Sequence, residues 1–515
     1  MRRIRLFNTN FELITLLAIV AFGVLLRVEA HRHLINVSPD GVAFIEGAIR
    51  VLNGVGIFHR RGPLFQLLLM ISFTIFGASF ESSTLVPLFF GSIVPILLFF
   101  LGKHFFDAKT GLFAALLGAL NPQLIDLSCW VLRETTSSAL ILLMIFAAHF
   151  SLRIRSKKRS LIASVLPGFL SGLLILTREE MIFVIPPAYI AYIFLCERKR
   201  LDFVMRTVVF SITTMLTITP WLLYSNTYFG DPFYSYTYYL SSYLPPQGDG
   251  STPGAAPSTW SYTNLSGALS TIIFGLWKEL TEFPANLSLL GLLFFPIGVV
   301  FAIKKQGTWM IYLTIVSDLL ILSPEFFPLR HLGKPAATYY WNDVSRIIFS
   351  ALMPANIIVA YGIRRFIPFL SNWKGAEVTS FNPSPSLVKG LTILCLIIFG
   401  AITYIPPYTL NLQYSHDAES ALPFKESAEY LNSIGSTEGV FTMQPKLLAR
   451  YYQGPIYQLP EKGGFEHILE EAKNKGVKYL IVESTCVNTG ELIDLYYHAI
   501  NPNWRTIPPQ FVLMK

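Results

Sequence analysis

The chain has 515 residues, of which 52% are hydrophobic and 14% are charged, and it carries a formal net charge of +8. This composition excludes an ordinary soluble protein, and the length excludes one small domain. Residues 408–515 carry 9 Lys and Arg against 12 Asp and Glu. The positive charge therefore belongs to the apolar part, where it indicates membrane topology and not a nucleic-acid partner.

Apolar runs long enough to cross a membrane recur from the N-terminus to about Pro406, which predicts a polytopic membrane protein with a mostly α fold. The first run follows Arg2, Arg3 and Arg5 and lacks a small-residue cleavage site, which indicates a retained anchor. About eleven spans are predicted in one helical bundle, near residues 11–28, 83–102, 110–127, 135–153, 161–177, 181–196, 203–223, 286–303, 308–323, 346–363 and 388–406.

A polar segment from Asn36 to Leu64 interrupts this pattern directly after the first span. Pro39 suits the first turn of a helix, so we predict a helix over about 41–52 with Asp40 at its mouth. Its apolar residues recur at helical spacing, namely Val42, Ile45, Ile49 and Leu52. Such a helix is suited to lie along the membrane surface, and we expect the short apolar segment 64–77 to do the same.

The distribution of charge over the loops predicts the topology. With segment 64–77 lying flat, the loops on the N-terminal side contain 17 Lys and Arg against 4 Asp and Glu, and those on the far side contain 9 against 13. The positive-inside rule then places the N-terminus in the cytoplasm of a multi-pass plasma-membrane protein. Loops 29–82 and 224–285 and the C-terminal region are predicted to be external.

Two domains are predicted, a transmembrane domain over residues 1–407 and an external soluble domain over residues 408–515. Loop 224–285 contains the stretch PPQGDGSTPGAAPST, which has no capacity to pack a core, and then a second surface helix over 265–280. The C-terminal domain is predicted to be a small α/β fold, with helices near 425–433, 445–452 and 465–475 and strands near 439–443, 477–483 and 510–514. We interpret it as a structural or acceptor-docking cap.

Charged residues gather at the outer ends of the spans and in the outer loops: Asp40, Arg60, Arg61, Arg133, Glu134, Arg178, Glu179, Glu180, His331, Asp343 and Arg346. Arginines match phosphate oxygens in a bidentate manner, and a single carboxylate accepts a proton from an attacking hydroxyl. This set suits sugar transfer from a phospholipid carrier, because a phosphate leaves without being protonated and needs only cations to stabilise its growing charge.

The order of several motifs resembles the GT-C superfamily of membrane glycosyltransferases, in particular the branch with protein O-mannosyltransferases and the lipid A aminoarabinose transferase. The motifs are PDGVAFIEGAIRVLNGVGIFHRRGPL, LGKHFFDAKTGLFAALLGALNP, LRETTSSALILL, TREEM, TPWLLYSNTYFGDPF and SRIIFSALMP, within about residues 11–365. The resemblance implies a polyprenyl-phosphate sugar donor, two surface helices after the first span and a catalytic acidic residue that falls on Asp40. Gly41 stands where several members carry a second carboxylate, which weakens metal ligation by such a pair.

We therefore predict an inverting glycosyltransferase that moves a sugar, such as the hexose mannose, to an acceptor hydroxyl on a protein, glycan or lipid at the external face. Asp40 is the predicted base. Four arginines are predicted to bind the donor phosphate, namely Arg60, Arg61, Arg178 and Arg346. Three residues are predicted to support the acceptor or a metal, namely Glu134, Glu179 and His331. The metal is unknown, and a divalent cation such as Mg²⁺ or Mn²⁺ is one way to balance the phosphate charge.

Alternative readings remain open for these residues. Asp40 is also a good helix cap, and Arg60, Arg61 and Arg346 also suit anchoring at lipid headgroups. A structural ion-pair cluster explains Glu134, Arg178 and Glu179 equally well, and His331 also suits a satisfied loop histidine. At the level of the whole protein, the alternatives are a lipid or glycan transporter or flippase, and a non-catalytic subunit for envelope assembly.

The predicted topology is tested by single cysteines at Ser156 and Ser251 in a variant without the native cysteines. An impermeant thiol reagent added to intact cells should label the cysteine at 251 and not the one at 156, because only the former loop is expected outside. Both should react in permeabilised cells. The reverse labelling pattern in intact cells would overturn the arrangement of all the spans.

Overall fold

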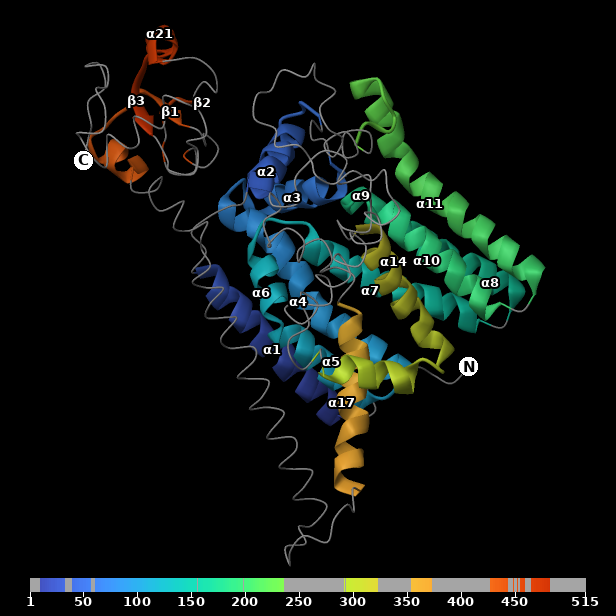
Figure 1. Ribbon diagram of the computed structural model, residues 1–515. Coiled ribbons are helices and arrows are strands. Elements are labelled where there is room, and N and C mark those ends of the chain that lie inside the picture. Colours follow the sequence, from blue (N-terminus) through green and yellow to red (C-terminus); the bar gives the residue numbers. More distant parts are fainter. Residues whose placement is uncertain are drawn as a thin grey trace, which may run out of the picture. The chain divides into compact units, whose positions relative to one another are not determined.

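The computed structural model describes residues 10–32, 39–56, 61–235, 291–322 and 353–372, except 155, 198 and 292, and parts of 427–481. These residues are mostly helical, with a small sheet near the C-terminus, which confirms the predicted fold class (Figure 1). The chain divides into a larger unit of residues 1–32 and 43–411 and a smaller unit of residues 33–42 and 412–515. The number of spans and the boundary at 407 stay predictions.

Five helical stretches of the described residues are long and apolar enough to cross a membrane. They are α1 (Asn10–Arg32), α4 (Phe80–Phe105), α7 (Glu134–Arg153), residues 158–177 of α8 (Lys157–Ala163) and α9 (Val165–Thr177), and α11 (Arg200–Phe229). Shorter helices fill the spaces between them, namely α10 (Met181–Cys196), the helix Leu293–Ala302, α14 (Trp309–Leu322) after the turn η1 (Gln306–Thr308), and α17 (Ala355–Asn372). α17 continues to Asn372, beyond the predicted end at 363, and segments 265–280 and 388–406 lie outside the described residues.

The predicted span 110–127 coincides with two helices instead of one, because the chain bends there. α5 (Ala108–Leu120) and α6 (Pro122–Cys129) meet at an angle of 54°. Pro122 has no N–H to continue α5, and the Asn121 side chain caps the new helix by accepting a hydrogen bond of 2.8 Å from Leu124 N. Neither helix alone is long enough to cross a membrane, but the two together are.

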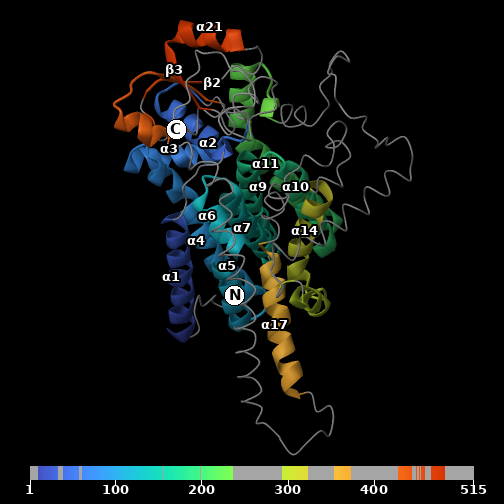
Figure 2. The same cartoon turned by 60° about the vertical axis from the view of Figure 1, so that its left-hand side comes forward.

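The membrane part packs around α7. In the apolar 18-residue stretch of this helix, 78% of the residues are buried. α4 lies against α5, α6 and α7, while α9 lies against α7 and α11 (Figure 2). In the apolar 18-residue stretches of α1 and α11, only 17% and 22% of the residues are buried. The exposed side chains of these helices include Leu17, Phe22, Ile212 and Leu216. Such apolar outer faces are typical of helices that face lipid.

Two short helices, α2 (Pro39–Leu52) and α3 (Leu64–Phe76), follow the first span as the sequence predicts. Pro39 occupies the first helical position. The rings of Phe44 in α2 and Phe65 in α3 are both fully buried and meet edge to face at 5.1 Å. A Cβ on Gly47 would lie 2.6 Å from the Gln66 side chain, so glycine permits the close approach of the two helices. Their position on the membrane surface stays a prediction.

The smaller unit contains a parallel sheet of β1 (Gly439–Thr442), β2 (Ile456–Gln458) and β3 (Val477–Ile481) in the order β2-β1-β3. Helix α21 (Phe465–Lys475) precedes β3 directly, as predicted. The core of the smaller unit includes Leu431, Val440 and Tyr452. β2 was not predicted, and the predicted strand 510–514 lies outside the described residues.

Arg27 of α1 is fully buried and holds the break between α5 and α6. Its Nη1 donates to Gly23 O at 2.8 Å and to Ala119 O at 3.3 Å, while Nη2 donates to Gly118 O at 3.4 Å. Its Nε donates to Ser128 Oγ in α6 at 3.2 Å. Since Pro122 ends α5, the last carbonyls of that helix have no intrahelical donor, and Arg27 supplies both the donors and a positive charge at the helix C-terminus.

We expect Arg27→Met to destabilise the protein by about 2–4 kcal/mol, because it leaves buried carbonyls without donors. The measurement is reversible unfolding of the purified protein in mixed micelles. Arg32→Met is the matched control on the same helix, because Arg32 is exposed and pairs with the exposed Glu29 at 3.3 Å. It should change the free energy of unfolding by less than about 0.5 kcal/mol. Equal stability of both variants would contradict the structural role of Arg27.

Candidate functional site

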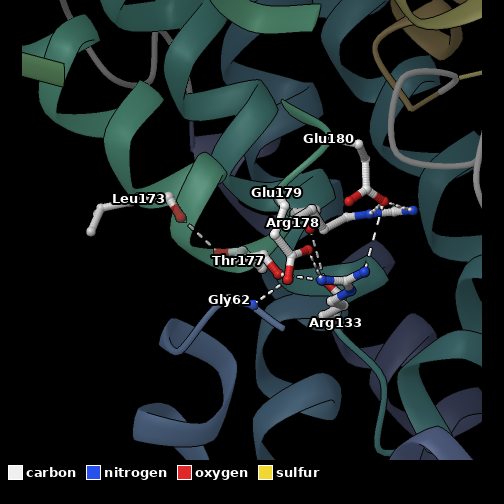
Figure 3. A network of polar contacts seen from close by, with 8 residues as sticks. Gly62, Arg133, Leu173, Thr177, Arg178, Glu179 and Glu180 are labelled. Atoms are coloured by element: carbon white, nitrogen blue, oxygen red, sulfur yellow. Dashed lines mark hydrogen bonds and ion pairs between the residues drawn. The ribbon is translucent and has the colours of Figure 1, made fainter. Parts of the chain in front are cut away.

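A buried network of charges joins the start of α7 to the corner between α9 and α10. Arg133, Arg178, Glu179 and Glu180 are each no more than 6% exposed. Arg133 Nη1 lies 2.8 Å from Glu179 Oε2 and also donates to Thr177 O at 3.0 Å. Arg178 Nη2 lies 2.7 Å from Glu180 Oε1, and its Nε donates to the same oxygen at 2.9 Å (Figure 3).

The same network fixes the loop between α2 and α3. The Gly62 N–H donates to Glu179 Oε1, so one carboxylate binds both the loop and Arg133 (Figure 3). A Cβ on Gly62 would lie 2.3 Å from Leu176 O, so only glycine brings the backbone this close to α9. Glu179 thereby fixes the backbone directly after Arg61.

The electrostatics of the network are dominated by opposite charges in contact. Burial by itself would raise the pKa of Glu180, but the charges of Arg178 and Arg133 hold that pKa well below the ordinary value of 4.5. Burial likewise opposes the charge of Arg133, but Glu179 and Glu180 raise the pKa of its guanidinium. Glu180 and Arg133 are therefore both ionised at neutral pH.

Arg61 lies beside the buried contact between α2 and α3. Its guanidinium carbon is 5.9 Å from the centroid of the Phe44 ring, and the side chain is half-buried. Asp40 lies in the first turn of α2, four residues before Phe44, and is also half-buried. Residues four apart share one face of a helix, so Asp40 and Phe44 follow each other along α2.

The other end of the same loop reaches a row of aromatic rings at the end of α11. Trp221 and Tyr224 are stacked at 5.5 Å, and Tyr224 and Tyr228 at 5.6 Å. Gly56 has a φ of +88°, and a Cβ there would lie 2.6 Å from the Tyr224 hydroxyl. Stacked aromatic rings of this kind are typical both of sugar-binding surfaces and of the interfacial belt of membrane proteins.

The predicted site residues divide into three groups. Glu134, Arg178 and Glu179 lie in or beside the buried network, which favours structural and positioning roles for them. Asp40 lies in α2, and Arg61 lies in the loop that follows this helix, beside Phe44. Three further predicted residues, Arg60, His331 and Arg346, lie outside the described residues.

The described residues do not fit a resident metal ion. No group of three or more His, Cys, Asp or Glu side chains gathers among them. Glu179 and Glu180 face arginines, and Gly41 stands beside Asp40 in place of a second carboxylate. Within the part of the chain that the structure describes, arginines therefore balance the negative charges of Glu179 and Glu180.

Several buried polar residues near this site were not singled out from the sequence. Gln66 is fully buried in α3, and neither polar atom of its amide has a hydrogen-bond partner among the described residues. The same is true of the hydroxyls of Thr135 and Thr136 in the first turn of α7. A single polar residue inside an apolar run, such as Gln66 or Arg27, is a usable sequence signal. The threonines give no such signal, because hydroxyl side chains are common at helix starts.

The fold is that of the GT-C superfamily of membrane glycosyltransferases, which confirms the resemblance found in the sequence. Residues 60–224 match the family described as dolichyl-phosphate-mannose-protein mannosyltransferase. That segment includes Arg61, Gly62 and the whole buried network. Comparison with curated protein sequences finds no match.

Solved structures with this fold include two kinds of enzyme. The apo oligosaccharyltransferase of Archaeoglobus fulgidus has a TM-score of 0.57 and 12% identity, over 92% of this chain and 69% of that one. The same organism's oligosaccharyltransferase AglB, in complex with an inhibitory peptide and a dolichol-phosphate, has a TM-score of 0.52 and 13% identity, over 90% and 69%. ArnT from Cupriavidus metallidurans bound to undecaprenyl phosphate has a TM-score of 0.54 and 12% identity, over 90% and 89%.

The buried network predicts the pH dependence of stability. Glu180→Gln should lower the free energy of unfolding by about 3–5 kcal/mol at pH 7, because it leaves two buried arginines undercompensated. The folded-state pKa of Glu180 is lowered, so its contribution is fully present above the ordinary value of 4.5 and is lost as the pH falls below that value. The difference between wild type and variant should therefore shrink below about pH 4.5, as measured by unfolding at a series of pH values.

Glu46→Gln is the matched control, because Glu46 pairs with Arg50 at 3.5 Å with both side chains substantially exposed. Its effect should stay below about 0.5 kcal/mol at every pH. A Glu180→Gln variant as stable as wild type at pH 7 would show that the network does not stabilise the fold.

Proposed function

We propose that the protein is an inverting glycosyltransferase that transfers a sugar from a polyprenyl-phosphate donor to an acceptor hydroxyl at the external face of the plasma membrane. The observation that carries this proposal is the hydrogen bond from Gly62 N–H to Glu179, which fixes the backbone next to Arg61. The matching family is described as a dolichyl-phosphate-mannose-protein mannosyltransferase, which supports mannose as the sugar. The bound dolichol-phosphate and undecaprenyl phosphate of the neighbouring structures support a lipid-linked donor.

In the proposed reaction Asp40 takes the proton from the acceptor hydroxyl. The acceptor oxygen forms a bond to the anomeric carbon from the face opposite the phosphate, and the bond from that carbon to the phosphate oxygen breaks. The electron pair stays on the phosphate, whose charge Arg60, Arg61 and Arg346 stabilise. A single displacement of this kind inverts the anomeric configuration.

The buried residues have positioning roles in this proposal. Arg178 uses Nε and Nη2 on Glu180, so we assign it to holding Glu180 beside Arg133 and not to the phosphate. Glu179 positions Arg61 through Gly62. Glu134 begins α7 directly after Arg133, where its negative charge suits a helix N-terminus. His331 remains proposed as a residue on the acceptor side, and the acceptor is proposed to be a protein, glycan or lipid.

The decisive variant is Asp40→Asn, which keeps the size of the side chain in the first turn of α2 but cannot take a proton. We expect transfer of radiolabelled mannose from polyprenyl-phosphate mannose to membrane acceptors to fall at least about 100-fold, the lower range for a positioned base. A role in stabilising the start of α2 alone predicts near-normal turnover. The measurement uses membranes from cells that lack the native protein.

Glu46→Gln is the control on the same helix, because Glu46 is exposed and pairs with Arg50. Thermal unfolding of each variant separates lost activity from lost folding. A well-folded Asp40→Asn variant with the wild-type rate would remove Asp40 as the base. Absence of label transfer by the wild type from every polyprenyl-phosphate sugar supplied would instead favour a transporter or an assembly subunit.

A further inference from the structure

A group of four cations lies on α17 and beside the helix Leu293–Ala302, away from α2 and α3 (Figures 1 and 2). We call it the basic cluster, and it consists of Lys304, Lys305, Arg364 and Arg365. The two lysines follow the helix Leu293–Ala302, and the two arginines lie in α17. Among the described residues, none of the four forms an ion pair, whereas nearby Lys103 is bound to Glu12 at 2.6 Å.

Two stacked aromatic rings contact two of the four cations, Lys305 and Arg365. Phe106 and Tyr361 are stacked with centroids 3.8 Å apart. Lys305 Nζ lies 4.6 Å from the Phe106 centroid and 5.2 Å from that of Tyr361. The Arg365 guanidinium lies 5.1 Å from the Tyr361 centroid, and its Nε donates to the Tyr361 hydroxyl at 2.9 Å. Lys305 Nζ also donates to Phe105 O at 3.5 Å. Among the described residues, rings and a backbone carbonyl therefore fix the two cations, and carboxylates do not.

The turn that carries the lysines is also fixed. Trp309 Nε1 donates to Ile303 O at 2.8 Å, and the Thr308 hydroxyl donates to Ala302 O at 3.0 Å and to Lys305 O at 2.8 Å. Directly before the lysines, Phe301 and Ile303 are 52% and 51% exposed. A Trp beside exposed apolar residues and then cations is typical of the level at which hydrocarbon meets lipid headgroups.

One donor of the cluster has no hydrogen-bond partner among the described residues. Arg364 Nε is buried and makes no hydrogen bond to any described residue. A buried donor of a charged group without an acceptor is costly, so its partner is expected to be an external oxygen. Phosphate is the oxygen group that arginine binds in a bidentate manner.

We propose that the basic cluster is a binding site for the phosphate of an anionic phospholipid in the adjacent leaflet, with its acyl chains against the exposed apolar residues beside the turn. Under the predicted topology this is the cytoplasmic leaflet. The site is at the other end of the bundle from Arg61 and Gly62, and it neither requires nor uses the transfer reaction.

The test measures binding of phosphatidylglycerol to the whole protein by native mass spectrometry. The protein is held in nanodiscs of phosphatidylcholine with increasing shares of phosphatidylglycerol. The double variant Lys305→Met with Arg365→Gln should weaken binding about 25-fold, about fivefold for each cation removed. Arg365→Lys, which keeps the charge and loses the planar fork, should fall between wild type and the double variant.

The control is Lys109→Met with Arg159→Gln, which removes two exposed cations elsewhere among the loops predicted to share this side. It should bind phosphatidylglycerol as the wild type does, and all variants should unfold at the wild-type temperature in phosphatidylcholine alone. Equal losses in the two double variants would show a general effect of surface charge and overturn the site. Competition by soluble glycerol phosphate equal to that by the lipid would assign the cluster to a soluble phosphate and overturn the lipid. If the double variant misfolds, Arg365→Lys carries the test, and wild-type binding by it overturns the proposal.

Discussion

The carboxylate of Glu179 is the constraint on which the arrangement of the bundle beside α2 and α3 depends. One oxygen pairs with Arg133 at the start of α7 and the other accepts the Gly62 N–H of the first loop. One side chain therefore fixes the loop, the start of α7 and the corner between α9 and α10 relative to one another. Buried ion pairs give little net stability because desolvation offsets the attraction, so the main effect of this contact is on geometry.

A second theme is the use of buried arginines to satisfy helix ends. Arg133 donates to Thr177 O at the end of α9, and Arg27 donates to Gly118 O and Ala119 O at the end of α5. In both cases the carbonyls have lost their intrahelical donors, and a cation at a helix C-terminus also matches the helix dipole. Water cannot satisfy such carbonyls inside a membrane, so an arginine from a neighbouring helix replaces it.

Much of the helical framework could be predicted, because span length and hydropathy are local properties. The predicted 135–153 and 181–196 agree closely with α7 and α10. The break at Pro122 carried a local signal, an Asn before a Pro, but the apolar run around it favoured one span. The contacts of Arg27 with Ala119 and of Glu179 with Gly62 join residues 92 and 117 positions apart, so a single sequence does not reveal them. For the site, the sequence identified the charged residues but not which of them bind one another.

The two ends of the bundle differ in the groups that contact their cations, which are carboxylates at one end and aromatic rings at the other. At the end with α2 and α3, two arginines and their carboxylates neutralise one another in the interior, so the surrounding backbone is fixed before any ligand binds. At the other end, Lys305 and Arg365 are held by aromatic rings, which position a cation without neutralising it. The first arrangement suits preorganisation of a reaction site, since no free energy is spent on reorganising these groups when the reaction occurs. The second leaves positive charge available, and a membrane rich in anionic lipid supplies the missing countercharge.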